Sequence, residues 1–167
     1  MMLYIALFLY TPYILFLIYN RSPYEIYKSL ENNIYGKDVF NYIISLVSPY
    51  SGSIYPSIEL FEKTSCRCSI IERKCLKNPF NSVHALALAN LGEFTSGLLM
   101  MEYLQSLKKK GIITKITAEY HKKARGKITA ICNLSEFKNG QIKSDLINEQ
   151  GDIVCEIKCQ WLIKDIH

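Results

Sequence analysis

The sequence has no Cys-x-x-Cys pair, and its three histidines do not stand at the spacings of a zinc site. Six cysteines are present nevertheless. Cys66 and Cys68, like Cys155 and Cys159, are separated by even intervals inside expected strands, so each pair faces one side of a sheet. We expect free, buried thiols in a reducing compartment, with disulfides or a metal site as the alternative. No residue is predicted to bind a metal or a cofactor.

The sequence also lacks a recognisable nucleic-acid-binding motif, an internal repeat and a low-complexity segment. Its net charge of +5 is modest, and lysine is plentiful together with Tyr, Ile and Asn, as a biased codon usage would produce. We therefore predict no nucleic-acid partner. A chain of 167 residues suits one domain of ordinary size with an extension.

Charged side chains are absent from residues 1–19, which as a helix would be about 28 Å long, close to the thickness of the hydrocarbon layer. The basic start and small-residue cleavage site of a signal peptide are missing. We predict that residues 1–20 anchor the protein in a membrane, with the domain facing the cytosol because Arg21 and Lys28 follow on that side. The alternative is a hydrophobic N-terminal helix that covers the domain or a partner, in a soluble cytoplasmic protein.

Helices are predicted over residues 21–50. Ser22, Pro23 and Glu25 form a capping sequence for a first helix that ends near residue 31. An apolar stripe over residues 39–47 predicts a second helix, and residues 48–52 should form a linker.

Six strands are predicted after these helices. Residues 54–62 and 64–72 form the first two, before a long helix. The basic segment Lys108-Lys109-Lys110-Gly111 should form a turn that opens a four-strand antiparallel meander. Its strands are expected near residues 115–120, 128–134, 141–147 and 153–163, with a hairpin at Asn139-Gly140.

The long helix is apolar on nearly every side. Residues 85–101 contain a single charge, Glu93, which indicates a buried helix. Asn81 or Ser82 can cap it, and His84 falls in its first turn. Because only this segment is apolar enough to fill a sheet with one buried face, we predict an α+β fold in which the antiparallel sheet wraps around it.

A lone carboxylate in such a helix requires an explanation, because burial of an unpaired charge is costly. Desolvation would raise the pKa of Glu93, as is common for catalytic acids and bases. The alternative is a glutamate that faces a neighbouring lysine or is exposed near the helix end.

A sheet around one long helix resembles the hotdog fold. Asn78, His84 and Glu93 are spaced as in the PaaI-like hotdog thioesterases, whose pattern is Asn-x-x-Gly-x-x-His-Gly-Gly followed by an acid in the helix. A closer resemblance is to the hotdog family known as domain of unknown function 4442. It extends over residues 23–165, and residues 51–167 are then the hotdog domain. The segments that resemble this family are residues 36–50, 78–93 and 120–126, together with Trp161 in the final strand.

Three positions depart from the PaaI-like pattern. Asn81 replaces the glycine before the histidine, although asparagine can also adopt a left-handed conformation. Ala85 and Leu86 replace the two glycines after it, so the acyl slot is expected to be narrower or displaced. A Ser or Thr that many such enzymes use has no clear counterpart, Thr114 being merely close in sequence.

The resemblance implies hydrolysis of an acyl thioester, carried by coenzyme A (CoA) or a carrier protein. It implies that the N–H of Ala85 polarises the carbonyl, that Glu93 is the general base or nucleophile, that Asn78 orients the water or carbonyl, and that His84 supports the turn. It also implies a homodimer with the site between protomers, or a tetramer. In the alternative, Asn78 is a turn residue and His84 a helix cap.

Basic side chains are concentrated after the third strand. Lys122, Lys123, Arg125 and Lys127 are candidates for binding the phosphates of CoA, or else belong to a solvated turn. The sequence thus indicates an acyl-CoA thioesterase-like hydrolase, and its rival is a non-catalytic hotdog protein that binds acyl thioesters or lipids.

Overall fold

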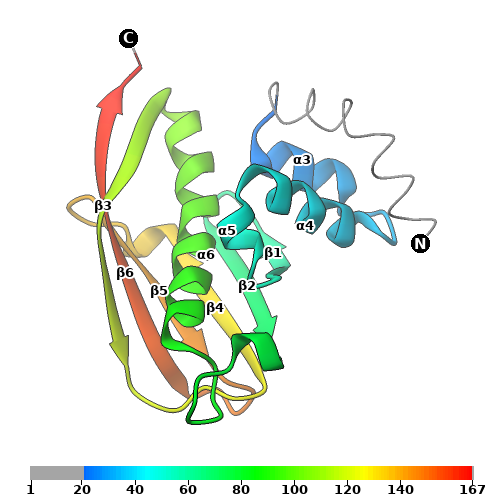
Figure 1. The fold of residues 1–167 in the computed structure, drawn as a ribbon. Coiled ribbons are helices and arrows are strands. Elements are labelled where there is room, and N and C mark those ends of the chain that lie inside the picture. Colours follow the sequence, from blue (N-terminus) through cyan, green and yellow to red (C-terminus); the bar gives the residue numbers. More distant parts are fainter. Residues whose placement is uncertain (1–20, 167) are drawn as a thin grey trace.

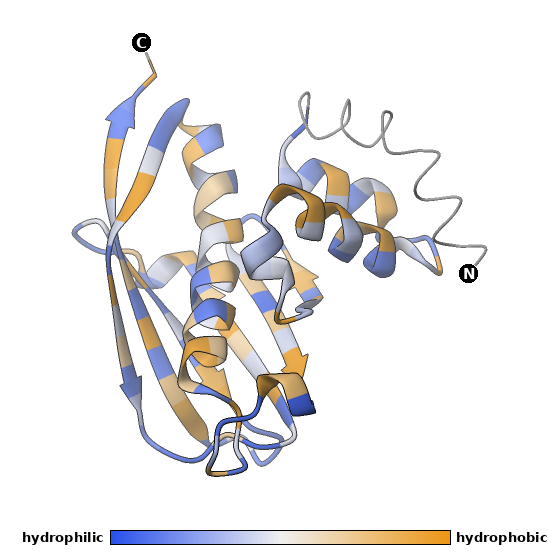
Figure 2. Cartoon of the chain, in the orientation of Figure 1, coloured by the Kyte–Doolittle hydropathy of each residue, from blue (hydrophilic) through white to orange (hydrophobic). Residues whose placement is uncertain are grey.

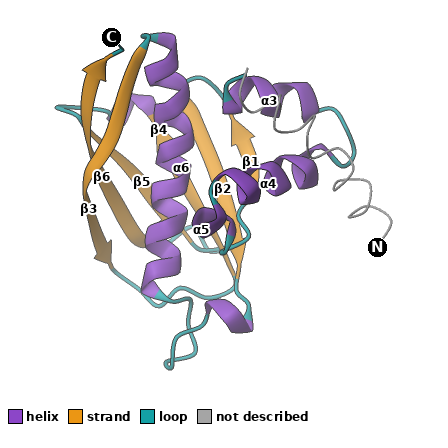
Figure 3. Ribbon diagram, turned by 45° about the horizontal axis from the view of Figure 1, so that its top comes forward, coloured by secondary structure: helices purple, strands orange, loops and turns teal. Residues whose placement is uncertain are grey.

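The computed structural model describes residues 21–166, so the predicted anchor in residues 1–20 lies outside the described residues. In the described part, one antiparallel sheet curves around a long helix, and smaller helices pack beside that helix (Figures 1 and 3). Among residues 21–166, no helix combines the length and hydropathy needed to cross a membrane.

The helices are, in chain order, α3 (Pro23–Leu30), α4 (Gly36–Val47), α5 (Pro49–Gly52) and α6 (Ala85–Ser106), with short 3₁₀ turns at Lys74–Leu76 and Leu134–Glu136. The capping sequence predicted for α3 is confirmed, since the Ser22 hydroxyl accepts a hydrogen bond from the Glu25 N–H at 3.0 Å. The Glu25 carboxylate in turn accepts one from the Ser22 N–H. The expected linker at residues 48–52 is wrong, because Pro49 begins the short helix α5.

The six strands are β1 (Ser57–Phe61), β2 (Ser65–Ile71), β3 (Lys109–Tyr120), β4 (Lys127–Asn133), β5 (Gln141–Ile147) and β6 (Ile153–Asp165). Their order in the sheet is β1-β2-β4-β5-β6-β3, and all neighbours are antiparallel. The predicted four-strand meander is therefore only partly correct. β4, β5 and β6 form one, but β3 pairs with β6 at the far edge.

Two turns, one directly before β3 and one directly before β5, depend on residues that adopt a positive φ. Asn139 and Gly140 both have positive φ, 53° and 76°, as the predicted type I′ hairpin requires. The expected turn at residues 108–111 is wrong. Lys108 alone, with φ of 53°, reverses the chain after α6, and β3 begins at Lys109.

The hydrophobic core lies between α6 and the concave face of the sheet. Figure 2 shows hydrophobic and hydrophilic residues alternating along the strands. α6 approaches β6 closely at Gly92, where a Cβ atom would lie 2.5 Å from Ile157. The Ser144 hydroxyl of β5 donates a hydrogen bond to the Gly92 carbonyl at 2.9 Å.

The predicted free thiols are confirmed, and all but one of the cysteines are buried. Burial raises the pKa of Cys132 and Cys155 to about 12, so these thiols stay protonated and act as small apolar side chains. Cys75, in the loop before α6, is the exposed one.

Candidate active site

The N-terminus of α6 is capped by His84, which confirms the alternative in which His84 is a helix cap, whereas the expected caps Asn81 and Ser82 are wrong. The Nδ1 atom of His84 accepts a hydrogen bond from the Leu86 N–H at 3.1 Å. The N–H of Ala85, the first residue of α6, has no acceptor among residues 21–166. It is therefore a free donor at the positive end of a 22-residue helix.

The loop before α6 is held by Asn78. Its Oδ1 atom accepts hydrogen bonds from the Phe80 N–H (3.0 Å), the Ser82 N–H (3.2 Å) and the Ser82 hydroxyl (3.2 Å). Asn81 has a φ of 55°, the left-handed conformation that was expected where the thioesterase pattern has glycine. The side chain of Asn78 thus fixes the loop that delivers the chain to His84 and Ala85.

A pocket of about 290 Å³ lies at this helix end. It brings together four of the predicted site residues, namely Asn78, Ala85, Lys122 and Lys123. His84 instead lines a separate pocket of about 170 Å³ on another side of the helix start. Arg125 and Lys127 line neither pocket.

Tyr120 also lines the larger of these two pockets and was not predicted as a site residue. Its hydroxyl donates a hydrogen bond to the Ala85 carbonyl at 3.0 Å, and burial raises its pKa. In the sequence, only its position directly before His121-Lys122-Lys123 could have drawn attention to Tyr120, and that position does not reveal a contact with α6.

The predicted basic residues differ in their partners. Lys122 forms an ion pair with Asp152 at 2.9 Å, and Lys127 forms one with Glu59 at 2.5 Å. Lys123 and Arg125 are exposed and form no ion pair within the described part of the chain. Of the four, these two are the most available to an external anion.

Glu93 lies in the middle of α6, two turns beyond its N-terminus. Its carboxylate forms neither a hydrogen bond nor an ion pair with any of residues 21–166. Burial, with no compensating cation, raises the pKa of Glu93. Glu93 therefore neither pairs with a lysine nor lies near a helix end, as the alternative expected, and its side chain is half-buried.

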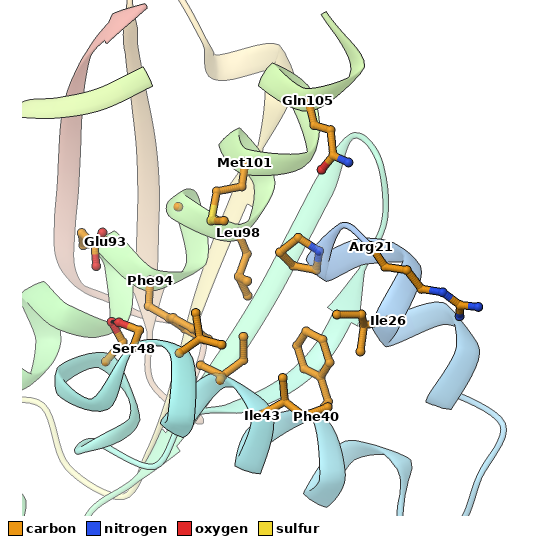
Figure 4. A pocket seen from close by; sticks show the side chains of 15 residues that line it. Arg21, Ile26, Phe40, Ile43, Ser48, Glu93, Phe94, Leu98, Met101 and Gln105 are labelled. Carbon is orange, nitrogen blue, oxygen red and sulfur yellow. Dashed lines mark hydrogen bonds between the residues drawn. The ribbon is translucent and has the colours of Figure 1, made fainter. Parts of the chain in front are cut away.

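A pocket of about 460 Å³ includes Glu93 in its wall. It lies between α6 and the helices α3, α4 and α5. Figure 4 shows Glu93 on one side of this pocket and Arg21 on the opposite side, with apolar side chains between them. A desolvated carboxylate thus borders a space large enough for a small molecule.

Ala85 and Glu93 do not share a pocket. They are eight residues apart on one helix, which corresponds to about 12 Å along its axis. A water activated by Glu93 and a carbonyl bound to Ala85 would have to lie within about 3 Å of their respective groups. One α6 helix therefore cannot supply both groups to one reacting carbonyl.

One group of side chains has metal-ligand atoms close together. Atoms of Glu119, His121 and Glu156 lie within 4.8 Å of one another on the surface formed by β3 and β6. Lysines already neutralise both carboxylates, Lys158 at 2.7 Å from Glu119 and Lys143 at 3.2 Å from Glu156. A cation there would have to compete with these ion pairs.

The fold is similar to that of known structures. The protein called genomics APC5556 is 20% identical, with a TM-score of 0.74 over 86% of this chain and 99% of that chain. PA5026 from Pseudomonas aeruginosa, called a probable thioesterase, is 17% identical, with a TM-score of 0.66 over 75% and 93% of the two chains. PaaI of the Escherichia coli phenylacetic acid degradation operon is 11% identical, with a TM-score of 0.60 over 75% and 90%.

At these identities the likeness establishes the fold alone, and no curated protein matches the sequence. The domain family described as "Domain of unknown function (DUF4442)" matches residues 36–163. This match contains α4, α5, α6 and all six strands except the last two residues of β6. The chain therefore has the thioesterase-like hotdog fold, and it belongs to the DUF4442 family.

Proposed function

We propose that this protein hydrolyses acyl thioesters, with acyl-CoA as the substrate class. The observation that carries the proposal is Glu93, an unpartnered carboxylate with a raised pKa in the wall of an apolar pocket. A half-buried, partly desolvated carboxylate without a partner costs stability, which favours a functional role. The free N–H of Ala85 supplies the complementary group for a carbonyl oxygen.

In the proposed reaction, Glu93 removes a proton from a water molecule that attacks the thioester carbonyl carbon. The N–H of Ala85 and the positive end of α6 stabilise the negative charge that develops on the carbonyl oxygen. When the carbon–sulfur bond breaks, protonated Glu93 returns the proton to the leaving thiolate. The products are the free fatty acid and the thiol, and the proton balance closes on Glu93.

Asn78 and His84 act as positioning residues in this scheme. Asn78 holds the loop through three hydrogen bonds to its Oδ1 atom, and His84 caps the helix that carries Ala85. Lys123 and Arg125, with Lys122 and Lys127 near by in sequence, are proposed to bind the phosphates of CoA.

A homodimer completes the proposed site, because one α6 helix holds Ala85 and Glu93 too far apart. The surface that favours a second copy is β3, an edge strand of 12 residues with one neighbour in the sheet. Ile116 and Tyr120 pair in register with Cys159 and Cys155 of β6, so they face the concave side. Both are 47% exposed. We propose that pairing of two such edges brings Ala85 of one protomer near Glu93 of its partner.

We expect Ile116→Lys to convert the dimer to a monomer and to abolish hydrolysis, because it places a charge at the centre of the proposed interface. Light scattering at micromolar concentration measures the mass. The matched control is Ile71→Lys on β2, whose isoleucine is 64% exposed but lies away from the β3 edge. A wild type that is monomeric and active would contradict the shared site. A tetramer that Ile71→Lys reduces to an active dimer would support it and would add a second interface at β2.

The proposed activity is tested by incubating the purified full-length protein with acyl-CoA esters of two to sixteen carbons and measuring the release of free thiol. Turnover well above the uncatalysed rate supports the proposal. Binding of acyl-CoA with no turnover for any chain length would instead establish the rival function, a non-catalytic acyl-thioester-binding protein.

Membrane attachment through residues 1–19 stays a prediction from the sequence. We expect the full-length protein in the membrane fraction, with its domain cleaved by protease added to the cytosolic side of sealed vesicles. Recovery in the soluble fraction with Met1 intact would exclude the anchor and favour the soluble cytoplasmic alternative. A protease-shielded domain would exclude the cytosolic orientation.

A further inference from the structure

The 460 Å³ pocket follows α6 lengthwise. Glu93, Gly97, Met101 and Gln105 all line it, and they stand at every fourth position of the helix. Residues with this spacing form one row on a helix surface, and a row of this length covers about 18 Å. The pocket is therefore elongated, with Glu93 in the row nearest the N-terminus of α6 and Gln105 nearest the C-terminus.

The walls of the pocket are mainly apolar, with Ser48, Ser51 and Gln105 as the uncharged polar residues. Ile26 of α3 and Phe40 and Ile43 of α4 face Phe94 and Leu98 of α6 across it. The charged lining residues are Glu93 and Arg21, and Arg21 directs its guanidinium group away from the pocket (Figure 4). Binding there depends on burial of apolar surface rather than on hydrogen bonds.

We propose that this pocket binds the hydrocarbon tail of the substrate, which enters beside Glu93 and extends along α6 beneath α3 and α4. The inference rests on the proposed hydrolysis, which places the thioester carbonyl at Glu93. An elongated, mainly apolar space suits a linear chain better than a compact aromatic ring. The substrate class is therefore a thioester of a linear fatty acid of medium or greater length.

The same arrangement assigns the two halves of the substrate to different protomers. The tail lies against Glu93 of one protomer, while the CoA moiety extends over the helix start of the other. There, Ala85, Lys122 and Lys123 line the 290 Å³ pocket. Each substrate then spans the dimer interface. The helices α3 and α4, which lie outside the wrapped sheet, limit the length of the acyl chain that the pocket accepts.

Gly97 provides a direct test because it lines the pocket one turn beyond Glu93. A Cβ atom added there would meet only Glu93 Oε1, at the ordinary contact distance of 3.6 Å. A larger side chain therefore projects into the pocket without displacing the backbone, and it also removes a glycine from a helix interior. Gly97→Leu should fold and should fill part of the space for the tail.

For the wild-type full-length protein, we expect kcat/KM to rise about fourfold with each methylene group until the pocket is filled. For Gly97→Leu, the ratio of kcat/KM on dodecanoyl-CoA to that on butanoyl-CoA should fall at least tenfold. Gly97→Ala, which adds one methyl group, should lower this ratio less. If Gly97→Leu lowered kcat/KM equally for both substrates, their ratio would be unchanged. This result would mean that the variant disturbs Glu93 rather than the tail, and it would contradict the proposal.

A second variant keeps the test independent of Glu93. Met101 is half exposed and lies two turns beyond Glu93 in the same row, so Met101→Glu should fold and should place a charge against the tail. It should lower the dodecanoyl-to-butanoyl ratio in the same way as Gly97→Leu. The matched control is Leu107→Glu, which replaces a similarly exposed residue outside the pocket and should leave the ratio unchanged.

Binding measured without turnover separates this inference from the proposed hydrolysis. The probes are S-dodecyl-CoA and S-butyl-CoA, thioethers that cannot be hydrolysed, titrated by calorimetry. Tighter binding of S-dodecyl-CoA that Gly97→Leu weakens at least tenfold would support the pocket, even if no acyl-CoA is cleaved. Equal affinity for the two probes would overturn it, as expected if residues 1–19 of the chain itself fill the pocket. Hydrolysis with the same chain-length profile in every variant would overturn it and leave the proposed function standing.

Discussion

Replacement of Glu93 by glutamine should lower kcat by about 10²–10⁴-fold, the usual contribution of a positioned general base. Glutamine has the shape of glutamate but cannot accept the proton from water, so KM should change little. The control is Glu136→Gln, which changes an exposed glutamate in the turn after β4. A Glu93→Gln enzyme that hydrolyses at the wild-type rate would remove Glu93 from the mechanism.

The same substitution should increase stability at neutral pH. Burial raises the pKa of Glu93 in the folded state above 4.5, the ordinary value of a glutamate. Between the unfolded and folded pKa values, the folded state binds the proton more tightly, so the free energy of unfolding falls as pH rises through this window. Glutamine has no such dependence. The unfolding temperature of Glu93→Gln should exceed that of the wild type at pH 7, and the difference should vanish in acid below the unfolded pKa.

The pH profile of the reaction follows from the same shift. Because Glu93 must be ionised to act as a base, the rate should fall as pH decreases through its raised folded pKa. The midpoint of kcat/KM on the acid side should therefore lie above that of an ordinary glutamate. A midpoint at or below 4.5 would show that the group controlling the rate is not a desolvated carboxylate.

The second large effect is expected from Ala85→Pro, which removes the backbone N–H proposed to bind the carbonyl oxygen. Loss of one such donor costs about 10²–10³ in kcat. The fold should tolerate the change for three reasons. Ala85 is the first residue of α6, where proline is favoured. His84 before it is extended, with ψ of 138°. The lost N–H has no acceptor among the described residues.

Ala85→Ser distinguishes the N–H from the side chain, because it changes the side chain and retains the donor. Its loss of activity should be far smaller than that of Ala85→Pro. Circular dichroism and the unfolding temperature verify that both variants fold. If the proline variant folds and keeps wild-type activity, then Ala85 does not stabilise the carbonyl oxygen.

The sequence predicted those parts of the fold that depend on local interactions. The alternation of apolar residues located the strands, and Asn139-Gly140 located a turn that needs two positive φ values. The position of β3 beside β6 could not be predicted, because strand pairing is a long-range property that the alternation does not encode. The sequence favoured Asn81 or Ser82 as the helix cap because Ser, Thr, Asp and Asn usually take this role, and it offered His84 only as the alternative that the structure confirms.

For the candidate site, the sequence identified the carboxylate but not its surroundings. Glu93 stood out as the one charge in residues 85–101, and its desolvation follows from that isolation. The pocket beside it arises from the packing of α3 and α4 against α6, elements far apart along the chain. The role of Tyr120 could not be predicted for the same reason, because its hydrogen bond to Ala85 joins residues that meet only in the folded chain.

The most direct test of the shared site is complementation between two inactive variants. Ala85→Pro retains Glu93, and Glu93→Gln retains the Ala85 N–H, so a mixed dimer contains one site with both intact groups. After unfolding and refolding together in equal amounts, random pairing should restore about a quarter of the wild-type activity. Each variant refolded alone should remain inactive. A mixture no more active than its two components would contradict a site built from Ala85 of one protomer and Glu93 of its partner.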